Sequence, residues 1–118
     1  MSYQFYKVAH LIGVFMVLTS VVGAIVASRF TTAKDDFKKL IAINHGIGLV
    51  ISLVAGFGVL ARTELGFQSW VVLKLVIWIF FAAAPVLIKK MPEHGKNIWL
   101  ASTVIFAVAA WLAVYKPF

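Results

Sequence analysis

The chain has 118 residues, of which 63% are hydrophobic and 13% are charged, with a formal net charge of +7 and no cysteine. A small domain leaves much of its surface in water, so this composition excludes a soluble fold. The absence of cysteine excludes disulfides, thiol catalysis and cysteine-ligated clusters. The sequence therefore predicts a membrane protein whose apolar side chains are solvated by lipid.

Four apolar runs follow one another along the chain, and each is long enough to cross a bilayer, since a spanning helix needs about 20 mostly apolar residues. We expect helices at about residues 4–27, 36–61, 69–89 and 96–115. Because the connecting loops are short, consecutive helices should be antiparallel neighbours. The sequence thus predicts a single all-α transmembrane domain over residues 1–118, a four-helix bundle with up-down-up-down topology.

The first predicted helix carries a histidine near its start, in the stretch KVAHLIG at residues 7–13. An ionisable side chain in hydrocarbon is costly and usually serves a function. A neutral imidazole is a good ligand for haem iron, and one histidine is enough for five-coordinate iron. His10 is therefore a candidate axial ligand; a purely interfacial position a few residues inside the membrane is the alternative.

The second predicted helix repeats the pattern of the first, because both fit H-x-I-G-x4-L-x4-G, beginning at His10 and at His45. Antiparallel helices with one pattern form an inverted repeat, as in transporters; chance similarity between apolar segments is the alternative. On the face of His45, Gly48, Ser52 and Gly56 follow at a spacing of four, which lets another helix approach closely. This face predicts that His45 points into the bundle or an interface.

The third predicted helix carries Lys74, with Trp70 and Trp78 four residues to either side on the same face. Lys74 is a candidate cation for a haem propionate, a candidate second ligand in its neutral form, and a candidate catalytic group. The two tryptophans would form flat walls for a porphyrin. The alternatives are that Lys74 extends to the interface and that the tryptophans belong to an aromatic belt.

Two prolines punctuate the second half of the chain. Pro85 lies inside the third predicted helix, where it should bend or loosen the helix near its end. Pro92, in the stretch MPEHGKN, marks the turn to the fourth helix. His94 lies in this turn and is expected to be solvated.

The rise of 1.5 Å per residue places the intramembrane ionisable side chains in two layers. His10 and Lys74 lie about 4 Å and about 7 Å from one membrane face, and His45 lies about 9 Å from the other. Across a core about 30 Å thick, the two histidines should be separated by about 15–20 Å. Since a histidine nitrogen binds a metal at about 2 Å, they cannot share one iron. We expect a site with His10 and Lys74, and a second site at His45.

Basic residues are divided unequally between the two ends of the predicted bundle. Seven lie in loops at one end, and the other end has Lys7, Arg62 and Lys116; the seven are Arg29, Lys34, Lys38, Lys39, Lys89, Lys90 and Lys96. By the positive-inside rule the seven face the cytoplasm, and both termini face outward. The charge thus sets topology rather than binding nucleic acid. The expected partners are the lipid bilayer and a homodimer or larger membrane complex.

Two motifs carry a family resemblance: K-x-x-H-x-I at residues 7–12 and W-x-x-x-K-L at residues 70–75. Through them the chain resembles small four-helix bacterial membrane proteins, namely the haem-containing protoporphyrinogen oxidase of the HemJ type and the SirB-like family. The oxidase usually has a histidine where this chain has Val72. The resemblance implies a bacterial inner-membrane protein with haem b as cofactor, in which His10 ligates the haem and Lys74 is the lysine that the oxidase needs.

Three functions are therefore weighed. The first is a haem b- or porphyrin-binding protein with a redox role, which as an enzyme would be an oxidoreductase resembling protoporphyrinogen oxidase. The second is a non-catalytic subunit or assembly factor of a larger complex, which would hold its partner through the small-residue face of the second helix and the basic loops. The third is a small transporter, for which the middle of the bundle offers few polar residues: Thr19, Ser20, Ser52 and Thr103.

Overall fold

The computed structural model describes residues 2–30, 35–63 and 69–115 of the chain. These residues form four α-helices and one short 3-10 turn, without a strand among them: α1 Tyr3–Phe30, α2 Asp35–Thr63, α3 Ser69–Lys90, η1 Pro92–His94 and α4 Gly95–Tyr115. All four helices are long and apolar enough to cross a membrane, which confirms the predicted helix number and class. The helix α1 continues three residues beyond its predicted end, to Phe30.

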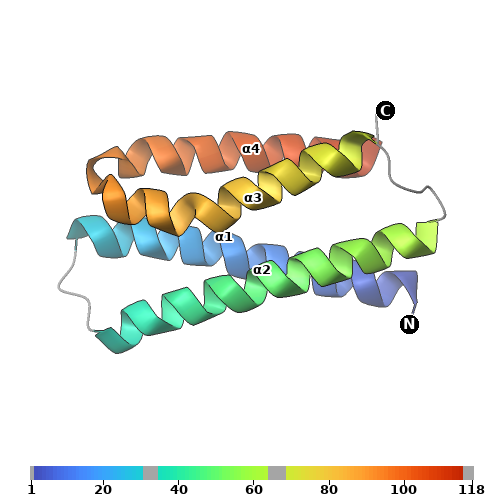
Figure 1. Ribbon diagram of the computed structural model, residues 1–118, viewed down its shortest axis with the longest axis horizontal. Coiled ribbons are helices and arrows are strands. Elements are labelled where there is room, and N and C mark those ends of the chain that lie inside the picture. The colour runs from blue at the N-terminus through green and yellow to red at the C-terminus, as the bar shows by residue number, and fades with distance from the viewer. Residues whose placement is uncertain (1, 31–34, 64–68, 116–118) are drawn as a thin grey trace.

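Consecutive helices run in opposite directions along the long axis, and both termini lie at the same end of the bundle (Figure 1). The bundle is flattened, with extents of 48 × 26 × 16 Å. The helix α1 packs along α2 and also contacts α3, α4 and η1, so it is the central element of the structure. A side chain on α1 can therefore reach a site formed by any of the other helices.

The outside of the bundle is apolar along its length. Each helix exposes large hydrophobic side chains for more than half of their surface, among them Phe15, Val54, Ile79 and Val104. A soluble monomer rarely exposes such continuous apolar surface, whereas hydrocarbon solvates it. The exposed faces are therefore those that a spanning bundle turns to lipid.

Two buried clusters fill the interior. The larger one lies in the half of the bundle near η1 and joins α1, α3 and α4 through Val17, Val21, Ile25, Phe81, Ala84, Ile88 and Ile98. The smaller one, nearer the termini, consists of Trp70, Val71 and Leu112. The candidate site adjoins the smaller cluster, because Trp70 and Val71 also line its cavity.

The backbones of α1 and α2 come close to each other at Gly13 and Gly48. A Cβ atom placed on Gly13 would lie 2.6 Å from the backbone nitrogen of Ser52, and one on Gly48 would lie 2.9 Å from the carbonyl oxygen of Gly13. Only residues without a side chain allow backbones to come this close. The Asn44 amide adds hydrogen bonds across the same interface, to the Met16 carbonyl at 3.1 Å and to Ser20 Oγ at 2.8 Å.

The repeated pattern of the sequence falls on this α1–α2 interface, and its contacts are reciprocal. Gly13 and Gly48 are equivalent positions of the repeat and contact each other. A Cβ atom on Gly48 would meet Met16, and one on Gly13 would meet Ile51, which is the residue equivalent to Met16. The repeat is thus accounted for by the packing of two antiparallel helices. The small-residue face of α2 is covered by α1 and does not face outward.

The two ends of the bundle differ in charge as the sequence predicts. Exposed lysines surround the end that carries η1: Lys38, Lys39, Lys89, Lys90 and Lys96. The opposite end, with both termini, has Lys7 and Arg62 (Figure 1). Lys34 and Lys116, which entered the same prediction, lie outside the described residues.

Candidate functional site

A cavity of about 130 Å³ lies between α2 and α3, and α1 contributes one residue to its lining. One polar side chain reaches it from α1, His10, while α2 contributes residues between 52 and 60 and α3 residues between 70 and 78. Four of the side chains expected to form a site line this cavity together: His10, Lys74, Trp70 and Trp78. His45, the fifth, does not line it.

The imidazole of His10 is held by a single hydrogen bond to α2. Its Nδ1 lies 2.7 Å from the carbonyl oxygen of Ser52. A carbonyl can only accept, so Nδ1 carries the hydrogen, and in a neutral imidazole Nε2 then presents its lone pair. Metal-ligating histidines usually donate their other ring nitrogen to a carbonyl or carboxylate in this way, which fixes the tautomer and the ring orientation. The hydrogen bond of His10 is thus of the kind that metal-ligating histidines make.

The missing side chain of Gly56 makes room for this ring. A Cβ atom on Gly56 would lie 3.2 Å from both Cε1 and Nδ1 of His10, closer than most such contacts. The sequence pattern identified Gly56 as a small residue for helix packing, but not as the neighbour of a histidine. Gly56 follows Ser52 by four residues, so the two are adjacent on one face of α2. Gly56 is therefore both a small residue of the packing face and the neighbour of the His10 ring that Ser52 binds.

Ser52 also connects His10 to Trp78. The hydroxyl of Ser52 donates to the Leu49 carbonyl at 3.0 Å, and the indole nitrogen of Trp78 donates to the same carbonyl at 3.1 Å. One turn of α2 therefore positions a side chain from α1 and another from α3. The sequence predicts Ser52 only as a small packing residue and a polar residue in the middle of the bundle, because no residue pattern marks hydrogen bonds to backbone carbonyls.

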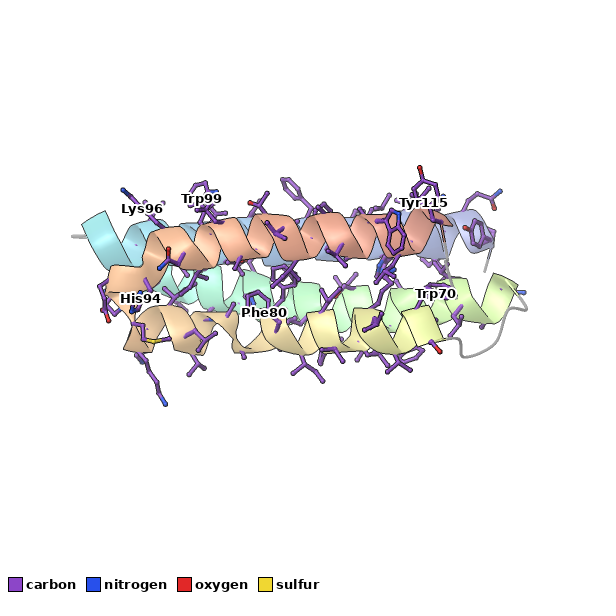
Figure 2. All side chains as sticks on the ribbon, turned by 90° about the horizontal axis from the view of Figure 1, so that it is seen from above. Trp70, Phe80, His94, Lys96, Trp99 and Tyr115 are labelled. Carbon is purple, nitrogen blue, oxygen red and sulfur yellow. The ribbon has the colours of Figure 1, made fainter. Side chains whose placement is uncertain are left out.

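Lys74 and Trp70 complete the wall on α3. Lys74 is half-buried and lines the cavity one helical turn from each tryptophan. Trp70 is only 8% exposed and packs against Val71 and Leu112. Figure 2 shows Trp70 near the end of the bundle opposite to His94. The burial of Trp70 contradicts the alternative that it belongs to an aromatic belt, because α4 covers it.

His45 lies apart from this site. It is 6% exposed, and its Nε2 lies 3.0 Å from the carbonyl oxygen of Phe81 on α3. The His10 ring packs between the levels of Ser52 and Gly56, which are seven to eleven residues along α2 from His45, or about 10–16 Å at 1.5 Å per residue. The two histidines thus cannot bind one iron within the chain. Among the described residues, no group of three or more histidine, cysteine or acidic side chains gathers into a metal site.

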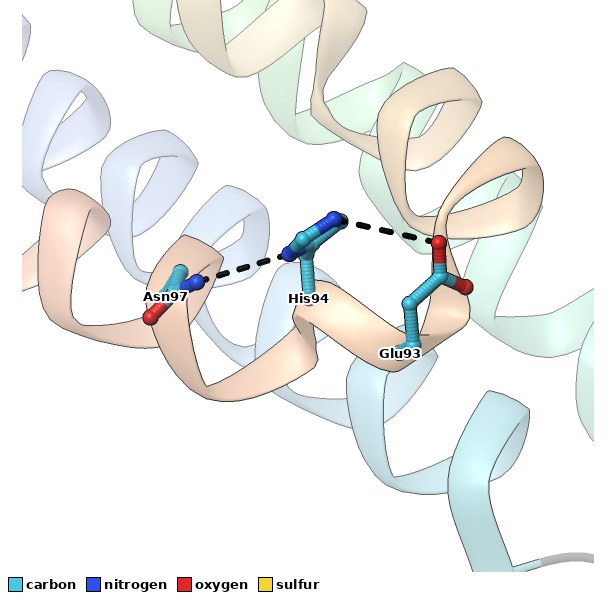
Figure 3. A network of polar contacts seen from close by, with 3 residues as sticks. All are labelled: Glu93, His94 and Asn97. Carbon is cyan, nitrogen blue, oxygen red and sulfur yellow. Dashed lines mark hydrogen bonds and ion pairs between the residues drawn. The ribbon is translucent and has the colours of Figure 1, made fainter.

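His94 has the solvated surroundings that the sequence predicts. It lies on the exposed turn η1, with its Nε2 3.8 Å from a carboxylate oxygen of Glu93 and its Nδ1 3.5 Å from the amide nitrogen of Asn97 (Figure 3). These partners are themselves exposed. His94 is therefore a surface histidine and serves as a natural control for the other two.

The chain matches no family model, no curated protein and no solved structure. What the fold and the site define is a class: an all-helical protein with four helices able to cross a membrane. Within it, one cavity brings a histidine, a lysine and two tryptophans together. Its function is accordingly argued from that cavity.

Proposed function

We propose that the protein is an integral membrane haem b-binding protein with a redox role, in which His10 is the axial ligand. The observation that supports this most is the hydrogen bond from His10 Nδ1 to the Ser52 carbonyl, because it leaves the lone pair of Nε2 for a metal. A bound haem b would supply one-electron chemistry at its iron. The resemblance to haem-containing protoporphyrinogen oxidase agrees with this assignment.

The donor set fits haem, and the cavity volume sets a condition on how it binds. A cavity of about 150 Å³ in another protein takes benzene, so the cavity here, about 130 Å³, encloses one ring and not a whole porphyrin. Of the helices that touch, α2 and α3 share the smallest contact. Haem binding in this proposal therefore requires these two helices to move apart along the cavity, on the side away from the hydrogen bond between Trp78 and the Leu49 carbonyl.

Lys74 and the tryptophans suit the periphery of such a ligand. In this proposal the ammonium of Lys74 pairs with a propionate, and the faces of Trp70 and Trp78 contact the ring. If the protein is an enzyme, Lys74 is the group placed to bind an anionic part of the substrate or to transfer a proton. His45, which was expected to bind a second cofactor, is given a different role below.

The bundle crosses the bacterial inner membrane in this proposal, as a single domain with both termini outside. The support is the lysine-rich end around η1, because basic residues are retained on the cytoplasmic side. The apolar outer faces of all four helices contact lipid.

The alternative, a non-catalytic subunit or assembly factor, loses one of its two expected docking surfaces. The small-residue face of α2 is covered by α1, which leaves the basic end as the surface for a partner. The transporter hypothesis is weakened as well, since the repeat is accounted for by α1–α2 packing. Co-purification with a larger complex in mild detergent, without pigment, would support the subunit hypothesis instead.

The proposal is tested by measuring haem per chain after purification in mild detergent, as pyridine haemochrome. We expect haem in the wild type and in His94→Ala, whose side chain is solvated, and none in His10→Ala. Haem that persists in His10→Ala would reject His10 as the ligand, and a wild type without any haem would reject the function.

A further inference from the structure

Pro85 leaves one carbonyl of α3 without its helical partner. In an α-helix the N–H of residue 85 would bond to the carbonyl of Phe81, and proline has no N–H. An unpaired carbonyl in an apolar interior is costly, and neighbouring helices commonly supply a substitute donor. Here the substitute is the Nε2–H of His45, at 3.0 Å from the Phe81 oxygen.

A second hydrogen bond between the same helices runs in the opposite direction. Trp78 of α3 donates its indole N–H to the Leu49 carbonyl of α2, at 3.1 Å. Leu49 lies one turn from His45, and Trp78 lies one turn from Phe81, so the two bonds form adjacent ties between α2 and α3. Each tie links a side chain to a main-chain carbonyl, which fixes the height of one helix against the other.

These ties lie at one end of the cavity. Trp78 forms one of the ties and is the last cavity-lining residue of α3. The lining of α2 begins at Ser52, three residues after Leu49, and continues away from His45. Beyond the ties, Leu60 of α2 packs against the cluster of Trp70, Val71 and Leu112 at the other end of the cavity, so the ties hold the end that carries Trp78. The ties therefore determine where the wall that carries Lys74 and Trp78 stands relative to His10.

We propose that His45 is a positioning residue for the His10 site: by bonding the carbonyl that Pro85 leaves unpaired, it holds α3 so that Lys74 and Trp78 face His10. The part that concerns haem rests on the proposed function, while the coupling of His45 to Pro85 stands without it. This role explains why a histidine is buried about 10–16 Å along α2 from the level of the His10 ring. It replaces a second metal site at His45.

A double-mutant cycle tests the coupling, with Tm in detergent as the readout. His45→Leu removes the donor and should lower Tm, while His45→Gln keeps an N–H donor and should stay near the wild type. Pro85→Ala restores the helical N–H to the Phe81 carbonyl, so His45→Leu should cost much less in that background. An equal loss of Tm in both backgrounds would overturn the pairing of His45 with Pro85.

Haem affinity, measured at a temperature well below the Tm of every variant, distinguishes a positioning role of His45 from a purely stabilising one. We expect His45→Leu to weaken haem binding about tenfold, the lower end of what outer-shell changes cost, and Pro85→Ala to restore it in the double variant. A Tm loss without any loss of affinity would overturn the positioning role.

Trp78 emission gives a readout that needs no haem. The emission of Trp78 is isolated by subtracting the spectrum of each variant's Trp78→Phe counterpart. It should shift in His45→Leu and return in His45→Leu/Pro85→Ala, because the wall that carries Trp78 moves and is restored. An unchanged Trp78 emission in His45→Leu would overturn the positioning role even in a protein that binds no haem, and a wild type without haem would by itself reject only the proposed function.

Discussion

The three histidines of the chain differ in what their ring nitrogens bond. His10 donates a hydrogen bond through Nδ1 and leaves Nε2 as the candidate ligand atom, whereas His45 donates through Nε2 to a carbonyl inside the bundle. His94 is paired with exposed residues on a surface turn. Their hydrogen bonds and exposure thus separate one candidate ligand, one structural residue and one solvated residue, although all three have the same chemistry.

Lys74 is expected to set haem affinity through its charge. Lys74→Met keeps much of the length of the side chain and removes the ammonium, so a propionate would lose its partner in a half-buried site. We expect about a tenfold loss in haem affinity, equivalent to about 1.4 kcal/mol, and a smaller loss in Lys74→Arg. Haem titration of the purified protein measures both. Lys90→Met, at an exposed position near η1, is the control; equal affinities in Lys74→Met and the control would contradict the assigned role.

Among the elements, the α1–α2 hairpin is the part on which the site depends most. It supplies His10, the acceptor carbonyl of Ser52 and the space beside Gly56. The backbones touch at Gly13, one turn from His10, so the distance between the helices and the geometry of the histidine are set together. A change that separates α1 from α2 should therefore also alter the geometry of His10.

Gly13→Ala tests this dependence. Its Cβ would lie 2.6 Å from the Ser52 nitrogen, a backbone atom that cannot rotate away. We expect a destabilisation of about 1–3 kcal/mol, as for overpacked cores, seen as a lower Tm, together with reduced haem content. Gly46→Ala is the matched control, because a Cβ there meets nothing within 4 Å and alanine favours a helix. The account would be wrong if the two variants behaved alike.

The helices and the layer that holds His10 and Lys74 follow from the sequence, because apolar run length and a fixed rise per residue determine both. The carbonyls that accept hydrogen bonds from the two buried histidines do not follow from the sequence. These helices are apolar on nearly all sides, so their rotation depends on where backbones can touch, as at Gly13 and Gly48. The Ser52 and Phe81 carbonyls became visible only with the packing, although the proline four residues after Phe81 was a usable signal.

For the molecule as a whole, charge and apolar surface define how it lies in the membrane. The apolar faces run the length of the bundle, and exposed lysines concentrate around η1. Figure 2 shows Lys96 pointing away from the bundle near that end. If the lysine-rich end faces the cytoplasm, as we propose, the cavity lies in the outer half of the membrane, towards the end where α1 begins.

Single-cysteine labelling tests the orientation, and the chain suits it because it has no cysteine of its own. Ser2→Cys lies at the end with the termini, and Met91→Cys lies beside η1; both positions are exposed. A membrane-impermeant maleimide added to spheroplasts should label Ser2→Cys and should label Met91→Cys only after the cells are opened. The reverse pattern would show that the lysine-rich end faces outward.

The ligation of haem by His10 can be tested by imidazole rescue. His10→Gly removes the ligand and leaves a space that free imidazole can enter. We expect His10→Gly, purified and supplied with haem, to show no bound-haem absorption band until imidazole is added. Wild type should show the band without imidazole. A band of equal strength in His10→Gly without imidazole would contradict the claim, because the iron would then have another ligand.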